Sequence, residues 1–171
     1  DLYLSAEGHD NYGQGYATVM RIGADRRLHR VAGSTTQVGY AGDGGPARSA
    51  LLHGNKDVVL DDRGGIYIAD ATNRRVRYVD NTGFITTVAG TGVPNNFSGD
   101  GGPALLADVY PRYLALGPDD SLWLSNPLYI RRINARGIIG RAIGKPPNGG
   151  CYDDGHPAPA IATHTVNFSF G

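Results

Sequence analysis

The chain has 171 residues, of which 26 are glycine and 10 are proline, and its 16 basic side chains are balanced by 16 acidic ones. The length fits about one domain, and the glycine and proline content indicates many turns without reaching the level typical of disorder. A formal net charge of zero disfavours nucleic acid and anionic membrane surfaces as partners, because a neutral surface attracts neither.

The beginning of the chain has neither the basic start nor the apolar segment of a signal peptide, and no apolar run is long enough to span a membrane. We therefore expect the chain to be part of a larger protein. The single cysteine, Cys151, has no partner within the chain for a disulfide, so a scaffold held together by internal disulfides is excluded. An idle thiol is the simplest interpretation of this residue, and its redox state and partner stay open.

Short segments of alternating apolar and polar residues, separated by turn residues, predict strands throughout the chain. In order, these segments are 2–5, 18–22 and 28–33, then 57–60, 66–70, 74–79 and 84–90, then 113–117, 122–126, 129–133 and 138–144. No window of about 11 or more residues holds a helical period without glycine or proline, which disfavours helical repeats. A single helical turn after Pro46 or Pro103 remains compatible with the sequence.

A stretch of glycine and aspartate between these groups of strands occurs three times. The copies AGDGGPA, SGDGGPA and YDDGHPA begin at residues 41, 98 and 152, so the repeat is about 57 residues long. The equivalence extends into the strands, where it relates Gly33, Gly90 and Gly144, Ile22, Val79 and Ile133, and Val19, Val76 and Ile130. A period of this size is typical of stacked or radially arranged units.

Four antiparallel strands followed by one long glycine-rich crossover make the unit of a β-propeller. The predicted fold class is therefore all-β, with about three four-stranded blades in one partial propeller that covers residues 1–171. The blade units are approximately 1–33, without a first strand, 55–90 and 111–144. Residues 145–171 supply a crossover and the start of the next blade.

The residues of the second and third units resemble the NHL-repeat family of propellers. The similarity lies in DDRGGIYIADATNRRVRYVDNTGFITTVAGTG at 61–92 and FSGDGGPALLADVYPRYLALGPDDSLWLS at 97–125. The order of motifs resembles bacterial NHL proteins and the propeller of teneurins and other RHS (YD-repeat) proteins. This resemblance implies the propeller fold, but the same fold serves adhesion receptors, toxin shells, sensors, ubiquitin-ligase scaffolds and some lyases.

Two departures from that pattern affect the expected function. Residues 7–15 are inserted in the first unit, and the third unit loses the turn that carries Asp70 and Asn73 in the second. We expect these two side chains to bond their own backbone, and their loss in one blade argues against a shared catalytic role.

Three blades are too few for a ring, because propellers close with about four to eight blades. An open arc would expose apolar sheet faces. We therefore expect other protein domains or subunits to complete a six-bladed or similar ring. A fragment of a larger protein is the favoured interpretation, and a pair of copies or docking onto other subunits stays open.

The repeated Gly/Asp loop is predicted to be structural. Pro103 and Ala104 stand where a phosphate-binding loop needs lysine and serine or threonine, and one aspartate per copy is fewer than a calcium loop uses. Glycines with positive φ, an aspartate that accepts backbone N–H groups and a proline before a helical turn suffice for a crossover. The structural crossover residues are Asp43, Gly44, Pro46, Asp100, Gly101, Pro103, Asp154, Gly155 and Pro157.

No residue is assigned to catalysis, to a cofactor or to a metal, although calcium stays an alternative. The histidines His9, His29, His53, His156 and His164 lack the spacing of metal ligands. The pairs Asp61/Asp62 and Asp119/Asp120 fall in predicted turns, which aspartate favours. The arginines of strands 74–79 and 129–133 are interpreted as a solvated face rather than as a nucleic-acid surface.

The leading hypothesis is a non-enzymatic scaffold segment of a larger extracellular or cell-surface protein that serves adhesion, protein interaction or assembly. The similarity to teneurins supports the location, and Asn96 and Asn167, each in an Asn-Phe-Ser sequon, are candidate glycosylation sites. Candidate binding elements are the insertion 7–15 and the crossovers 34–47, 91–104 and 145–158. The alternatives are a propeller lyase or hydrolase with a metal in its channel, and an intracellular NHL scaffold that binds protein or RNA.

Overall fold

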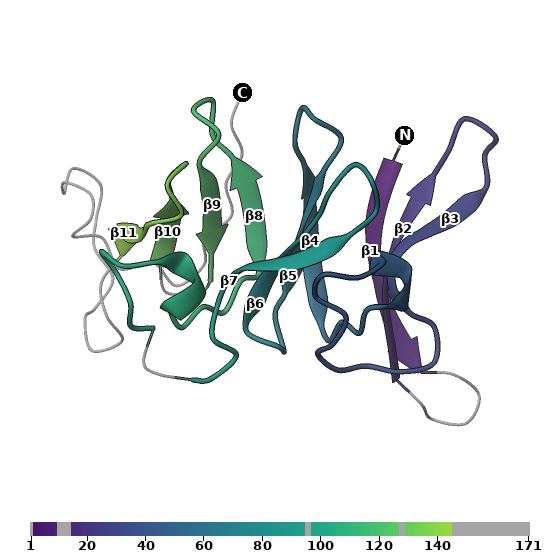
Figure 1. Cartoon of the computed structure of the whole chain (residues 1–171), viewed down its shortest axis with the longest axis horizontal. Coiled ribbons are helices and arrows are strands. Elements are labelled where there is room, and N and C mark those ends of the chain that lie inside the picture. Colours follow the sequence, from purple (N-terminus) through teal and green to yellow (C-terminus); the bar gives the residue numbers. More distant parts are fainter. Residues whose placement is uncertain (1, 10–14, 95–96, 127–128, 145–171) are drawn as a thin grey trace.

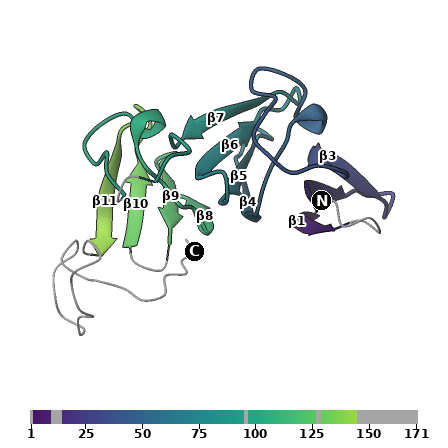
Figure 2. The same cartoon turned by 90° about the horizontal axis from the view of Figure 1, so that it is seen from below.

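The structure, a computed structural model, describes residues 2–9, 15–94, 97–126 and 129–144. It consists of three antiparallel sheets that follow one another along the chain and stand side by side like the blades of a fan (Figures 1 and 2). Blade 1 holds β1 (Leu2–His9), β2 (Gly15–Ile22) and β3 (Leu28–Ser34). Blade 2 holds β4 (Asn55–Leu60), β5 (Ile66–Asp70), β6 (Arg75–Val79) and β7 (Ile85–Ala89).

Blade 3 holds β8 (Tyr113–Leu116), β9 (Leu122–Ser125), β10 (Tyr129–Ile133) and β11 (Ile139–Gly144). Within each blade the strand order is the chain order, as expected for strands joined by tight turns. This arrangement confirms the predicted fold class, an all-β chain that forms part of a β-propeller. No helix among the described residues is long and apolar enough to cross a membrane.

The core of the molecule lies between the blades. One buried cluster joins Ala17, Val19 and Ala32 of blade 1 to Ile66, Ile68, Val79 and Ile85 of blade 2. A second cluster joins Ala69, Val76 and Ala89 of blade 2 to Leu122, Leu124, Ile133 and Ile139 of blade 3. The two clusters use equivalent positions, so the same contact between neighbouring blades, which we call the joint, occurs twice. Removing apolar surface from water is the main contribution of each joint to stability.

The register of the strands repeats as closely as the sequence does. A bulge follows Val19 in β2, Val76 in β6 and Ile130 in β10, where each of these residues faces the last strand of its blade. Gly33 and Gly90 both have positive φ, and a Cβ on either would lie 2.1 or 2.2 Å from a carbonyl oxygen of the neighbouring strand. The repeated glycine is therefore required by both its backbone conformation and this close approach.

Each crossover runs along the outer strand of the following blade before it turns inward. Gly44 N donates to Ile85 O and Ile85 N donates to Gly45 O; one repeat later, Gly101 N donates to Ile139 O and Ile139 N donates to Gly102 O. The helical turn after each proline is present as a short 3₁₀ helix, η1 (Ala47–Ser49) and η2 (Ala104–Leu106). Ala47 and Ala104 are buried between the blades, so the crossover is part of the joint.

Side chains on the inner strands tie successive blades together. Asn55 Nδ2 donates to Thr18 O of blade 1 over 2.9 Å, and Asp57 Oδ2 accepts from Leu114 N of blade 3 over 2.8 Å. Burial raises the pKa of Asp57, and the two backbone N–H groups that it binds oppose this only in part. Both bonds satisfy backbone groups of a neighbouring blade.

Candidate functional site

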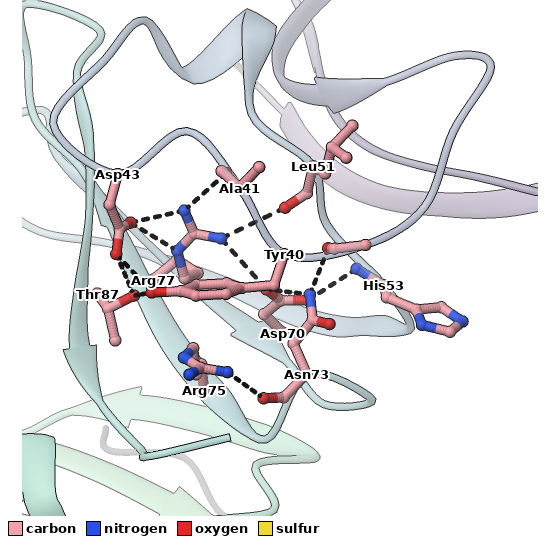
Figure 3. Close-up of polar contacts among 11 residues, drawn as sticks. Tyr40, Ala41, Asp43, Leu51, His53, Asp70, Asn73, Arg75, Arg77 and Thr87 are labelled. Atoms are coloured by element: carbon pink, nitrogen blue, oxygen red, sulfur yellow. Dashed lines mark hydrogen bonds and ion pairs between the residues drawn. The ribbon is translucent and has the colours of Figure 1, made fainter. Parts of the chain in front are cut away.

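The most strongly built polar cluster in the second blade surrounds Arg77 on β6 (Figure 3). This side chain has no exposed surface, and its Nη2 lies 2.6 Å from Oδ1 of Asp43 in the crossover. Its Nη1 lies 3.4 Å from Oδ2 of Asp70, a carboxylate that is also fully buried. The guanidinium further donates to the carbonyl oxygens of Ala41 and Leu51. The arginine therefore fastens the crossover to the face of the blade that it follows.

The second oxygen of the Asp43 carboxylate is also hydrogen-bonded. Its Oδ2 accepts from the hydroxyl of Tyr40 at 2.8 Å and from that of Thr87, on β7, at 2.7 Å. Burial raises the pKa of Asp43, but the bonds from Thr87 and Tyr40 and the charge of Arg77 together outweigh this, so the pKa lies below its ordinary value. The group is thus held ionised, as an ion pair requires.

The third blade repeats this arrangement, which we name the crossover latch. Arg131 on β10 is 1% exposed, and its Nε lies 2.8 Å from Oδ1 of Asp100. Arg141 replaces Thr87 at the equivalent place on β11, and its Nη2 lies 3.0 Å from Oδ2 of Asp100. In both described latches the carboxylate comes from the Gly/Asp loop and the buried guanidinium from the third strand, directly after the bulge.

Two sequence predictions about these residues are wrong. Asp43 and Asp100 bind arginine and hydroxyl side chains in place of the backbone N–H groups expected for a turn. Arg77 and Arg131 are buried rather than solvated. Alternation along a strand shows which residues share a face but not whether that face meets solvent, and here it meets the crossover.

The turn that carries Asp70 and Asn73 also differs from the prediction of bonds to its own backbone. Asp70 Oδ1 accepts from His53 N, 17 residues earlier, at 2.8 Å, and Asn73 Nδ2 donates to Asp70 and to Gly39 O. Burial raises the pKa of Asp70, although Asn73, His53 and Arg77 lower it in part. Asp70 and Asn73 therefore link the segment that precedes β4 to the turn between β5 and β6.

The remaining predicted site residues are placed as follows. Pro46 and Pro103 form isolated bridges with Phe84 and Ile138, and Gly44 and Gly101 have positive φ with open space around them. Asp154, Gly155 and Pro157 lie outside the described residues, as do the two sequons' Asn96 and Asn167 and the cysteine, Cys151. Of the candidate binding elements, the crossovers 34–47 and 91–104 are packed along blades 2 and 3 where they are described.

The aspartate pairs Asp61/Asp62 and Asp119/Asp120 lie in turns and contribute to their structure. Asp61 Oδ1 accepts from Arg63 N and Gly65 N, which confirms its predicted role. Asp119 Oδ1 accepts from the Ser121 hydroxyl, and Asp120 has a φ of 58°. Among the residues that the structure describes, no three histidine, cysteine or acidic side chains gather as a metal site.

A groove between blades 2 and 3 is the site that the sequence did not predict. It has a volume of about 480 Å³ and is lined by Leu60, Asp61, Tyr67, Tyr78, Leu116 and Asp120, among others. It continues, past Arg63, Tyr67 and Asp120, into a hollow of about 300 Å³ beside Leu122 and Ile133. Tyr67 and Tyr78 are neighbours on β5 and β6, and a tyrosine in each of two adjacent strands on one face was the available indication.

The groove combines an aromatic wall with charged groups at its mouth. The rings of Tyr67 and Tyr78 lie 4.7 Å apart, and the Tyr78 hydroxyl donates to Asp61 Oδ2 over 2.8 Å. Arg63 Nη2 reaches Asp120 Oδ2 of the other blade at 3.0 Å, with both side chains largely exposed. Such a surface can offer apolar contact and hydrogen bonds to a ligand.

We expect the replacement Asp61→Asn to lower the pKa of Tyr78. Partial burial, followed by the hydrogen bond and the negative charge of Asp61, raises this pKa to about 12. Without the carboxylate, the phenol should ionise closer to its ordinary value, and at a lower pH than in the wild type. The measurement is the tyrosinate absorbance as a function of pH, with Tyr78→Phe as the control that identifies the signal. An unchanged titration would show that burial alone sets the shift.

No protein-family model matches the chain, and no curated protein does so either. Among solved structures, a protein of unknown function from Bacteroides thetaiotaomicron superposes with a TM-score of 0.54 at 23% identity, over 75% of this chain and 31% of its own. A streptogramin B lyase superposes with a TM-score of 0.45 at 16% identity, over 80% of this chain and 39% of its own. A gluconolactonase candidate gives a TM-score of 0.44 at 15% identity, over 81% and 48%.

The chain thus spans less than half the length of these three structures. At such identities the likeness concerns the fold alone. The three repeated antiparallel sheets place the chain in the class of β-propeller proteins.

Proposed function

We propose that this chain is a non-enzymatic propeller segment that scaffolds protein interaction, adhesion or assembly in a larger extracellular or cell-surface protein. The observation that supports this role best is the crossover latch. Two of the most deeply buried charged side chains of the second and third blades, Arg77 and Arg131, hold crossover loops to the sheets. Such pairing makes the crossovers rigid supports for neighbouring surface loops.

The groove between blades 2 and 3 is the surface that we assign to a protein ligand. Its aromatic wall lies on two paired strands, and its charged mouth comes from the two adjacent turns. Sites carried by paired strands keep their shape on binding, which lowers the entropy cost of association.

The assignment to the NHL type, with likeness to teneurins and other YD-repeat proteins, belongs to the same proposal. It is supported by the motif order in residues 61–125. The extracellular location is supported by that similarity and by the sequon at Asn96. A glycan there would require passage through the secretory pathway.

Elemental analysis tests the non-enzymatic part of the proposal. We expect the purified protein to contain no stoichiometric divalent metal and to keep its melting temperature after treatment with a chelator. One tightly held metal ion per chain, together with a hydrolytic or lyase activity that chelation abolishes, would replace the scaffold by a channel enzyme. For the location, the intact mass after secretion from a eukaryotic host should show a glycan that is lost in Asn96→Gln.

A further inference from the structure

The aromatic wall of the groove between blades 2 and 3 is formed by a residue pair that differs in kind from its equivalents in the other blades. The residues that face each other at this register are Tyr3 and Arg21 on β1 and β2, Tyr67 and Tyr78 on β5 and β6, and Trp123 and Arg132 on β9 and β10. Blades 1 and 3 thus combine an aromatic ring with an arginine. Blade 2 has a second tyrosine in place of the arginine.

Blade 3 shows what the arginine does at this position. Arg132 lies over the ring of Trp123, with its Cζ 5.8 Å from the ring centre, and it pairs with Asp119 in the turn between β8 and β9. Elsewhere in the molecule the Cζ of Arg75 lies 3.7 Å from the ring centre of Tyr40. Because the face of an aromatic ring attracts a guanidinium and a carboxylate fixes its orientation, a ring beside an aspartate is a binding site for arginine.

Blade 2 has the same elements without an arginine between them. Asp61 and Asp62 lie in the turn between β4 and β5, which corresponds to the turn of Asp119. Among the residues that the structure describes, no arginine or lysine lies over the ring of Tyr67 or Tyr78. The Tyr78 hydroxyl donates to Asp61, which holds that ring beside the carboxylates. The rings are therefore available to a guanidinium that comes from another molecule.

The charge of the groove also favours a cation. Its lining carries three carboxylates, those of Asp61, Asp62 and Asp120, and one cation, Arg63. Arg63 lies 3.0 Å from Asp120 and 3.8 Å from Asp62, and its side chain is 72% exposed. Solvent screens such exposed pairs, so they contribute little to stability and an incoming cation can replace Arg63 at small cost. An acidic ligand would be repelled by the same lining.

We propose that this groove binds an arginine side chain of a protein partner, with the guanidinium against the tyrosine pair and beside the carboxylates of Asp62 and Asp120. Arginine fits better than lysine, because its planar group stacks on a ring and pairs with carboxylates at the same time. The inference rests on the proposed scaffold function in one respect, that the arginine belongs to a protein.

A titration of the full ¹⁵N-labelled chain with two capped tripeptides tests the inference. One peptide is Gly-Arg-Gly, and the other carries citrulline, which has nearly the shape of arginine but no charge. We expect saturable shifts of the backbone amide signals of residues 60–67 and 116–122 with the arginine peptide. The citrulline peptide should bind at least about fivefold more weakly, because it lacks the cation that the rings and carboxylates attract.

Two substitutions of charged residues separate local from general electrostatic effects. Asp120→Asn should weaken binding of the arginine peptide by about threefold, the size of effect typical of an exposed pair, and asparagine tolerates the φ of 58° at this position. Asp25→Asn is the matched control, since Asp25 is an exposed aspartate in the turn between β2 and β3, outside the groove. It makes the same change in net charge and should leave the affinity unchanged.

Two further variants change the competition for the groove. Arg63→Gln should tighten binding, because it removes the cation that now pairs with Asp120. Tyr78→Arg installs the arginine that blades 1 and 3 have at this register, so the chain's own guanidinium should occupy the site and abolish the shifts. The amide spectrum of each variant also reports whether it is folded.

The proposal is overturned by an absence of shifts in the groove, by equal binding of the two peptides, by weaker binding to Arg63→Gln or by equal losses in Asp120→Asn and Asp25→Asn. A capped Gly-Glu-Gly peptide that binds the groove as well would leave a protein-binding scaffold and exclude selection of arginine. A stoichiometric metal with a chelator-sensitive activity would contradict the scaffold function and leave the titration unaffected, so the two failures are distinguishable.

Discussion

Replacing Arg77 by methionine is expected to lower the free energy of unfolding by about 3–5 kcal/mol, the usual cost of removing one partner from a buried ion pair. Methionine is the residue that blade 1 has at this position, Met20, so the side chain fits the blade. The loss arises from Asp70, which is fully buried and would be left without its cation, and from Asp43, which would lose its ion pair. Urea denaturation at neutral pH measures the difference.

The control for this variant is Arg132→Met, on the same kind of strand one residue after the equivalent arginine. Arg132 is partly exposed and pairs with Asp119 at the surface, and such pairs contribute about 0–1 kcal/mol. Burial raises the pKa of Asp70, so a falling pH protonates this carboxyl in the folded state first. The deficit of Arg77→Met should therefore shrink in acid. Equal effects of the two substitutions would mean that the latch does not stabilise the fold.

The replacement Gly90→Ala is expected to cost about 3 kcal/mol or more. Gly90 has a φ of +97°, and a Cβ there would lie 2.2 Å from Arg74 O and 2.8 Å from Val109 in the joint between blades 2 and 3. A non-glycine residue in this conformation costs about 1–3 kcal/mol before any clash. The strands must separate to make room, which also opens the joint.

Gly83→Ala separates the two contributions to this cost. Gly83 has a similar φ of +89°, but nothing lies within 4 Å of its Cβ position. It should therefore show only the backbone contribution of about 1–2 kcal/mol. Thermal unfolding of the two variants gives the comparison, and equal melting temperatures would show that the close approach at Gly90 is relieved without cost.

The repeat made the fold accessible from sequence. The three Gly/Asp stretches fixed the period, and the equivalence of Val19, Val76 and Ile130 correctly identified equivalent strands. The structure adds a bulge after each of these residues, which the sequence analysis did not predict. Neighbouring strands within a blade pair through short local turns, and the residues that form such turns can be recognised in a single sequence. The ring of about six blades and the NHL assignment stay predictions.

The roles of the charged residues could not be obtained in the same way. Asp43 and Arg77 are 34 residues apart, and nothing local shows that a loop will lie over that strand. The groove at Tyr67 was missed for a similar reason, since its lining combines strands and turns of two different blades. Polar residues look alike in sequence whether they face water or a buried partner, whereas apolar periodicity reports burial directly.

The latch also has a consequence for the order in which the protein is made. Asp43 emerges from the ribosome 34 residues before Arg77, and Asp100 emerges 31 residues before Arg131. Most of the following blade must therefore be synthesised before the carboxylate of a crossover can pair with its arginine. Each completed blade would then fix the loop translated before it, as expected for folding in the order of synthesis.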